Sequence, residues 1–250
     1  MPTFRSKLQA SEPGKLEARA NGDATEIDVF GVIGDYGLRA EDFKRIIDSV
    51  NSPLINVNIN SPGGDVFAGI AAYNLLVEHP SQVHVRVHGL AASAASVIAL
   101  AGDSISMGDG AFLMIHNAWT VGIGDTREMA KMSRTLAKID RELAGLYANK
   151  TGIDAGDIQT MMDEETWLAA DDAIEQGFAD STFSDTKSAA KAAALYDMSA
   201  FKNVPKALIA KKRRGASAKE TTDTGRPTPE PDNLQPYLAG LERLAKTLSN

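Results

Sequence analysis

Residues 83–96 read Val-His-Val-Arg-Val-His-Gly-Leu-Ala-Ala-Ser-Ala-Ala-Ser, and the rest of the fold can be worked out from this stretch. Apolar and polar residues alternate from Val83 to Val87, which predicts a strand, and the apolar run after Ser93 predicts a helix. Ser93 therefore stands at a strand-to-helix turn among glycine and alanine residues. Small neighbours leave room for a substrate backbone, and a helix start directs free N–H groups at developing negative charge. This setting is typical of a nucleophile.

The preceding segments repeat the same order of strand and helix. Hydrophobic patterning predicts strands over 27–33 and 55–60, and helices over 39–50 and 66–77. This succession predicts parallel strands joined by right-handed crossovers, which is an α/β architecture. The carboxyl ends of parallel strands meet at one edge of the sheet, so we expect the Gly63-Gly64 pair and Ser93 to converge.

Two of the expected helices carry an apolar stripe. The segment 66–77 places Val66, Ile70, Tyr73 and Val77 on one face, which predicts the helix. The longest periodic segment, 125–150, carries its stripe at Met129, Met132, Leu136, Ile139, Leu143 and Leu146. This stripe either packs against its own domain or forms a projecting arm that meets another subunit.

Composition excludes several classes of protein. The 250 residues are 43% hydrophobic and 24% charged, as in an ordinary soluble globular protein. The chain has no cysteine, which excludes disulfides, thiolate metal sites and cysteine nucleophiles. Its longest weakly polar stretch, 89–101, is shorter than the about 20 residues of a membrane span, and the N-terminus lacks an export pattern. We expect a cytoplasmic protein with no membrane association.

The chain divides into three parts. We expect a flexible leader over 1–24, one domain over 25–184 and a basic, largely disordered tail over 185–250. The tail contains an alanine-rich run (188–195), a basic run (211–214), a Pro-rich stretch (215–236) and a predicted short helix (234–248). The net charge is −7, whereas the tail has 12 basic and seven acidic residues. The acidic body would repel nucleic acid, so we expect no specific nucleic-acid partner, and any polyanion contact would involve the tail.

His116 is the strongest candidate for a base, because it ends an apolar strand 23 positions after Ser93. It could equally be a satisfied core histidine. Of the other histidines, we expect His79 to cap a helix or lie on the surface, His84 to face solvent or an interface, and His88 to pack. A base also needs a carboxylate that orients it. The candidates cluster at 163–165, whereas Ser96 is expected to be buried and bonded to a helix carbonyl.

Four segments, taken together and in order, resemble the marker segments of the Clp protease proteolytic subunit: Ser61-Pro62-Gly63-Gly64, Gly89-X-Ala91-Ala92-Ser93, Met114-Ile115-His116, and Trp167 to Asp180. The resemblance covers roughly residues 27–182. It implies a Clp/crotonase-like spiral of β-β-α units with a long projecting helix.

The resemblance also implies roles for single residues. Ser93 would be the nucleophile and His116 the general base, while the Gly64 and Ala94 N–H groups would form the oxyanion hole. The family has an aspartate two positions before its aromatic-Leu pair, and here that position is Glu165. Asp163 and Asp171 remain alternatives for this third member. No metal, nucleotide or other cofactor is expected.

The glutamate and the long tail look closer to the Clp-like head-maturation (prohead) proteases of tailed bacteriophages than to housekeeping Clp peptidases. That similarity implies an ATP-independent serine endopeptidase that forms a homo-oligomer and trims scaffold and major capsid proteins inside an assembling shell. The tail would then be a packaging or scaffold segment, or a leftover. The sequence has no glycine loop ending in Gly-Lys-Ser/Thr, so any unfoldase would be a separate chain.

Four other interpretations are open. The chain could be a housekeeping Clp-type peptidase that works with a separate unfoldase. It could be a crotonase-like acyl-CoA enzyme, which would use paired backbone amides without a Ser–His pair, or a degenerate Clp-like scaffold without activity. It could also use a Ser–Lys dyad, for which only a lysine such as Lys138 on the long helix could serve.

Overall fold

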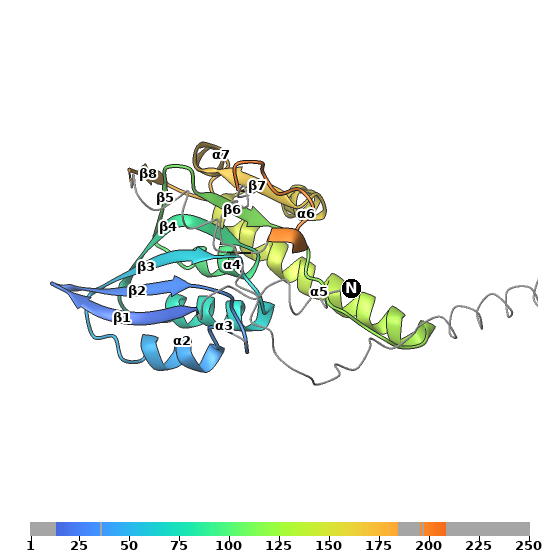
Figure 1. Cartoon of the computed structure of the whole chain (residues 1–250), viewed down its shortest axis with the longest axis horizontal. Coiled ribbons are helices and arrows are strands. Elements are labelled where there is room, and N and C mark those ends of the chain that lie inside the picture. The colour runs from blue at the N-terminus through green and yellow to red at the C-terminus, as the bar shows by residue number, and fades with distance from the viewer. Residues whose placement is uncertain (1–13, 36, 185–195, 197, 209–250) are drawn as a thin grey trace, which may run out of the picture. The chain divides into compact units, whose positions relative to one another are not determined.

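The computed structural model describes residues 14–35, 37–184, 196 and 198–208 (Figure 1). Its strands are β1 (Lys15–Asn21), β2 (Ala24–Phe30), β3 (Leu54–Ser61), β4 (Gln82–Ala92), β5 (Ser104–Gly108), β6 (Phe112–Ile115), β7 (Thr166–Ala169) and β8 (Ser181–Phe183). Its helices are α2 (Ala40–Ile47), α3 (Val66–Val77), α4 (Ala94–Ala99), α5 (Thr126–Thr151), α6 (Ala155–Asp163), α7 (Ala170–Glu175) and the 3-10 helix η1 (Met198–Ala200).

The strands form one mixed sheet in the order β1-β2-β3-β4-β5-β8, and β6 and β7 branch from β4. Strands β2, β3, β4, β5 and β8 are parallel. The succession of strands and helices along the chain predicted this parallel arrangement. Strand β4 changes partner along its length, because 84–87 pair with β5 and 90–92 pair with β6. This change of partner makes the sheet branch at β4, and the predicted α/β fold with a long helix is confirmed.

Two antiparallel pairs were not predicted. Strand β7 pairs with β6, and β1 pairs with β2 although residues 15–21 were expected to belong to the leader. The turn that joins β1 to β2 contains Gly22, whose φ of 60° favours glycine. Strand β1 lies at the edge of the sheet and most of its side chains are exposed. It therefore lacks the apolar alternation by which a buried strand is recognised.

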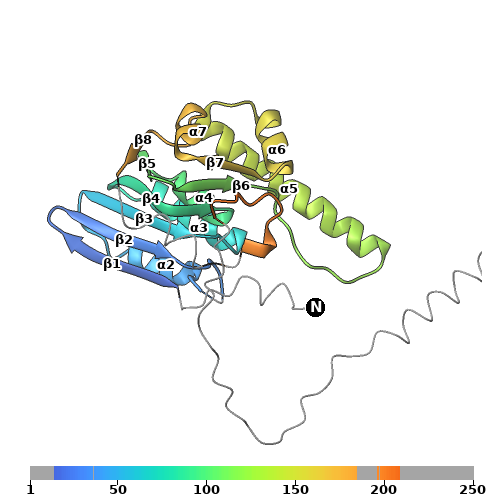
Figure 2. The ribbon, with the colours of Figure 1, turned by 45° about the horizontal axis from the view of Figure 1, so that its top comes forward.

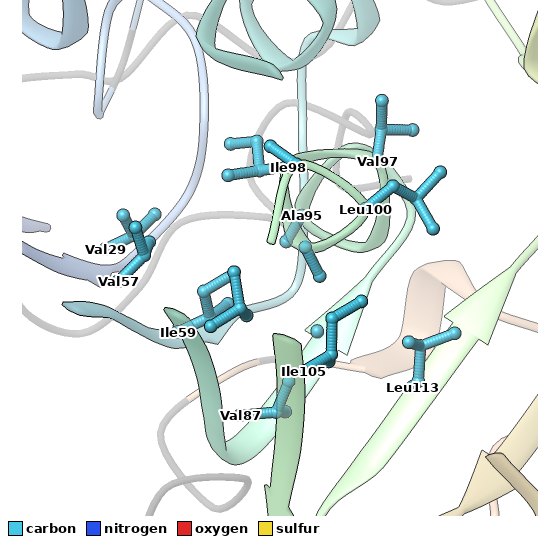
Figure 3. Close-up of a cluster of buried hydrophobic side chains, with 14 of the residues drawn as sticks. Val29, Val57, Ile59, Val87, Ala95, Val97, Ile98, Leu100, Ile105 and Leu113 are labelled. Carbon is cyan, nitrogen blue, oxygen red and sulfur yellow. The ribbon is translucent and has the colours of Figure 1, made fainter. Parts of the chain in front are cut away.

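The helix over 66–77 was predicted correctly, and most of its fully buried residues are small. Helix α3 buries Ala68, Gly69, Ala72 and Leu76, whereas Val77 is 55% exposed. The small residues allow α3 to lie close to α4, and a β carbon on Gly69 would be 2.9 Å from the Ala94 carbonyl oxygen. Helix α4 is wholly buried, and Figure 3 shows Ala95 on the side of the helix that faces Ile59 and Ile105 of the sheet. Small residues thus allow the close contact with α4, while Val66, Ile70 and Tyr73 are half-buried against the core.

Helix α5 matches the predicted long helix, and part of its stripe packs against its own domain. Its buried residues, Leu143, Ala144 and Tyr147, all lie in its second half. Its first half extends past the sheet, as Figures 1 and 2 show. A capping box between Asp125 and Glu128 begins the helix. Among the described residues, no helix has both the length and the apolar character needed to cross a membrane.

Part of the expected disordered tail is packed against the domain. Met198 and Leu208 are buried with Leu90, Ala92 and Met114, around which Tyr196, Phe201 and Val204 are half-buried. The alanine-rich run, the basic run, the Pro-rich stretch and the final helix of the tail lie outside the described residues, as do residues 1–13 of the leader.

Two glycine-to-alanine substitutions test the close approach of α3 to α4. Gly69→Ala should lower the free energy of unfolding by about 1–3 kcal/mol, because the new methyl group meets backbone atoms of α4. Gly145→Ala in α5 should raise it by up to about 1 kcal/mol, because no atom lies within 4 Å of that methyl position and alanine favours the helix. Urea unfolding of both variants checks this, and equal effects would contradict the packing described.

Candidate active site

Ser93 occupies a strained turn between β4 and α4. Its φ of 55° and ψ of −126° lie outside the regions that non-glycine residues normally adopt, at a cost of about 1–3 kcal/mol. Neighbouring strands fix the turn, because the Ser93 N–H donates to the Met114 carbonyl at 2.9 Å. The turn places the Ser93 hydroxyl between the end of β4 and the start of α4.

Ser96 supports this turn from inside the helix. Its hydroxyl donates to the Ser93 carbonyl at 2.6 Å and lies 2.7 Å from the Tyr147 hydroxyl. Both side chains are buried, and burial raises the pKa of Tyr147. Ser96 therefore bonds back to a carbonyl as predicted, and it joins the Ser93 turn to α5.

His116 lies beside Ser93, with its Nε2 atom 2.8 Å from the Ser93 Oγ atom. The sheet explains how residues 23 positions apart meet. Ala92 pairs with Met114 in the parallel β4–β6 ladder, so the residues that follow the two strands are neighbours. The His116 ring also meets the Phe201 ring edge to face, with centroids 5.8 Å apart.

The competing candidates lie elsewhere. The His88 Nε2 atom is 3.0 Å from Asn58 Oδ1, and its ring packs against Phe30 and Phe183, as a packing role predicted. His79 accepts a hydrogen bond from the Ser81 N–H near the end of α3, and Lys138 is exposed on α5.

Glu165 is the buried member of the three candidate carboxylates. It is 8% exposed, whereas Asp163 and Asp171 are exposed. Asp163 accepts hydrogen bonds from Asn117 and Gln159. Glu165 also has a positive φ of 54°.

The donors to the Glu165 carboxylate come mainly from the tail. It accepts hydrogen bonds from the Lys202 N–H (2.7 and 3.0 Å), the Asn203 N–H (2.7 Å) and the Trp167 indole (3.2 Å). Among the described residues, no hydrogen bond joins it to His116. Glu165 therefore acts on His116 through its charge in this arrangement.

The environment of His116 favours its neutral form. Burial lowers the pKa of His116 because it disfavours the charged imidazolium. The negative charge of Glu165 raises this pKa and the positive charge of Lys202 lowers it, and the net direction is downward. The ring can therefore accept a proton at a lower pH than an ordinary histidine.

The glycine pair passes directly against the Ser93 turn. Gly63 has a φ of 85°, and a β carbon there would overlap the Ala92 carbonyl oxygen and lie 2.9 Å from the Ala94 nitrogen. Gly64 has a φ of 147°, and a β carbon there would overlap the Ile33 carbonyl. Ala94 is the first residue of α4, so its N–H has no acceptor within the helix. The two predicted oxyanion donors thus belong to adjoining segments.

Sequence reasoning missed the tail residues that contact the site. Phe201 touches His116, and the Lys202 and Asn203 amides bind Glu165. An apolar spacing that includes Met198, Phe201, Val204 and Leu208 was the available signal. It lay in a segment whose flanking composition predicted disorder.

A hydroxyl paired with a neutral imidazole, beside a glycine-lined backbone, is equipped for acyl transfer. The described residues contain no cluster of three or more His, Cys, Asp or Glu side chains that could hold a metal ion.

A family comparison and a search of known proteins give matches to Clp proteases. The chain matches the Clp protease family over residues 47–186. It is 33% identical over 134 residues to the ATP-dependent Clp protease proteolytic subunit of Chlorella vulgaris, covering 52% of this chain and 66% of that protein. It is 31% identical over 137 residues to the corresponding subunit of Bacteroides fragilis, covering 54% of this chain and 66% of that protein.

The fold also has a solved counterpart. A ClpP1 mutant from Listeria monocytogenes superposes with a TM-score of 0.57 at 22% identity, covering 64% of this chain and 92% of that chain. The tail segment 198–208, which contacts the candidate site, lies beyond the residues that match the family.

Proposed function

The chain belongs to the Clp protease family, and we propose that it is a serine endopeptidase whose nucleophile is Ser93 and whose general base is His116. The observation that carries this proposal is the 2.8 Å contact between His116 Nε2 and Ser93 Oγ. A crotonase-like acyl-CoA enzyme would not need this pair, and an inactive scaffold would not need a strained serine. Both alternatives therefore leave the arrangement unexplained.

The reaction proceeds through an acyl-enzyme. His116 takes the Ser93 proton as the oxygen attacks the peptide carbonyl, and the Gly64 and Ala94 N–H groups stabilise the resulting oxyanion. The imidazolium then protonates the leaving amine as the C–N bond breaks. Water attacks the ester, His116 accepts its proton, and the carboxylic acid leaves as Ser93 recovers its hydrogen.

Glu165 is the third member that the burial and charge of the candidates support best. Its charge stabilises the imidazolium that forms during each step, because it raises the pKa of His116. Asp163 and Asp171 are exposed, and the carboxylate of Asp163 is bound to Asn117 and Gln159.

We expect Ser93→Ala and His116→Ala to fold and to lose activity by on the order of a thousandfold or more. The measurement is labelling by a fluorophosphonate probe, which reacts with an activated serine, together with the intact mass of the purified protein. Ser49→Ala, which removes an exposed hydroxyl just after α2, is the matched control and should still be labelled. Labelling of Ser93→Ala at the wild-type rate would contradict the assignment.

The same labelling should depend on pH. His116 must be neutral to accept the proton, so the rate should rise with pH as the imidazolium is lost. Because burial lowers the pKa of His116, the pH at which the rate is half-maximal should lie below the ordinary histidine pKa of about 6.5. A rate that is constant from pH 5 to 8 would argue against His116 as the base.

We further propose that the enzyme acts without ATP in the cytoplasm of a bacterial host, where it trims scaffold and major capsid proteins of a tailed bacteriophage. Two sequence features support this role: Glu165 in place of aspartate and the long basic tail. Co-expression with candidate shell proteins should shorten them, and Ser93→Ala should leave them intact. Cleavage that requires ATP and a separate unfoldase would favour the housekeeping alternative.

The projecting half of α5 supports a homo-oligomer. Trp119, Val121, Ile123 and Met129 expose apolar surface around its start, with Ile123 97% exposed and Val121 72% exposed. Exposed apolar groups that gather in one region are typical of an interface. We propose that a second copy of the chain covers this region.

Light scattering should therefore give a mass above that of a monomer at micromolar concentration. Ile123→Asp should lower this mass, because a charge would be buried in the interface. Val77→Asp, at a 55% exposed position at the end of α3, controls for the added charge alone. A monomeric wild-type protein would contradict the proposal.

A further inference from the structure

The segment 198–208 is anchored to the strands that carry the candidate site. Met198 and Leu208 are buried against Leu90, Ala92 and Met114, which lie on β4 and β6 just before Ser93 and His116. Two residues before this segment, the Tyr196 hydroxyl donates to the Asn60 carbonyl of β3 at 2.8 Å. Burial of this kind gives the segment a defined position over the site.

The segment 198–208 supplies most of the hydrogen-bond donors to the buried Glu165 carboxylate. A buried carboxylate is costly unless hydrogen-bond donors surround it. Of the donors to Glu165, only the Trp167 indole belongs to the family-matched region, and its bond is the longest at 3.2 Å. The Lys202 and Asn203 N–H groups bind at 2.7 Å, and the Asn203 side chain donates to the Glu164 carbonyl at 2.6 Å. The tail therefore fixes where the charge of Glu165 lies.

The same segment covers the base. The Phe201 ring meets His116 edge to face at 5.8 Å and Trp167 at 5.7 Å, so it spans the base and the strand that follows Glu165. The charged groups that act on the His116 ring are Glu165 from the β7 side and Lys202 from the tail. The surroundings of the base are thus built in part from outside the family-matched residues.

We propose that residues 198–208 complete the active site, with the Lys202 and Asn203 amides as positioning groups for Glu165 and the Phe201 ring as a positioning group for His116. This proposal rests on the proposed function. The amides act through Glu165, and Phe201 acts through the imidazole that it shields from water.

The first test removes one amide. Asn203→Pro lacks the N–H that binds Glu165, whereas Asn203→Ala keeps it, so the difference between the two variants measures that N–H. We expect the fluorophosphonate labelling rate of Asn203→Pro to be about tenfold to a hundredfold lower than that of Asn203→Ala. In a Glu165→Gln background the difference should shrink to less than about threefold, because the amide acts through the carboxylate. An undiminished difference would overturn the proposal.

The second test does not depend on proline being accommodated. Phe201→Ala should admit water to His116, which raises the pKa of the ring and moves the midpoint of the rate–pH profile upward. Phe201→Tyr should restore the wild-type midpoint. Val204→Ala, a packing change in the same apolar cluster, should leave the midpoint in place.

The outcomes separate this inference from the proposed function. If the wild-type protein is not labelled, the serine peptidase assignment fails. If it is labelled and Phe201→Ala keeps the wild-type rate and midpoint, only the role of the tail is wrong. A midpoint shift in Val204→Ala equal to that in Phe201→Ala would also overturn it, because general loosening would then explain both.

Discussion

The geometry of this protein depends on the backbone of Ser93, which is held in a conformation that an isolated chain would avoid. The turn must leave β4, start α4 and still donate its N–H to Met114 on the neighbouring strand. Burial of α4 between α3 and the sheet provides the stabilisation that maintains this strain. Gly69 and Gly63 have no side chain where the helix and the glycine loop approach the turn, so the core and the candidate site meet the same steric requirement.

The position of His116 follows from a second constraint, which is the change of partner along β4. If β4 paired with β5 along its whole length, β6 would have no strand on which to align beside the serine. The branching of the sheet thus brings together two residues from different crossovers. The same branch leaves β7 antiparallel to β6, so that Glu165 enters from the opposite direction.

Sequence reasoning succeeded where hydropathy reflects position in the sheet. Strand β3 alternates and α5 has a long stripe, and both were predicted; the spacing of Ser93 and His116 also led to a pair that the structure brings together. It failed at the edge of the sheet, because β1 is mostly exposed and has little apolar pattern. The binding of Glu165 by the tail was beyond prediction, because it depends on a tertiary contact across 37 residues. The catalytic roles themselves remain predictions.

The contact between the tail and Glu165 has a consequence for how related sequences are compared. The groups at 202 and 203 that bind the carboxylate are peptide amides, which every residue except proline possesses. Substitutions at these two positions can therefore leave the contact unchanged while they remove the sequence identity between relatives. Homologues with dissimilar C-terminal regions could preserve the same arrangement, and an alignment would record only divergence. In this part of the molecule, superposition of backbones detects the shared arrangement better than comparison of sequences.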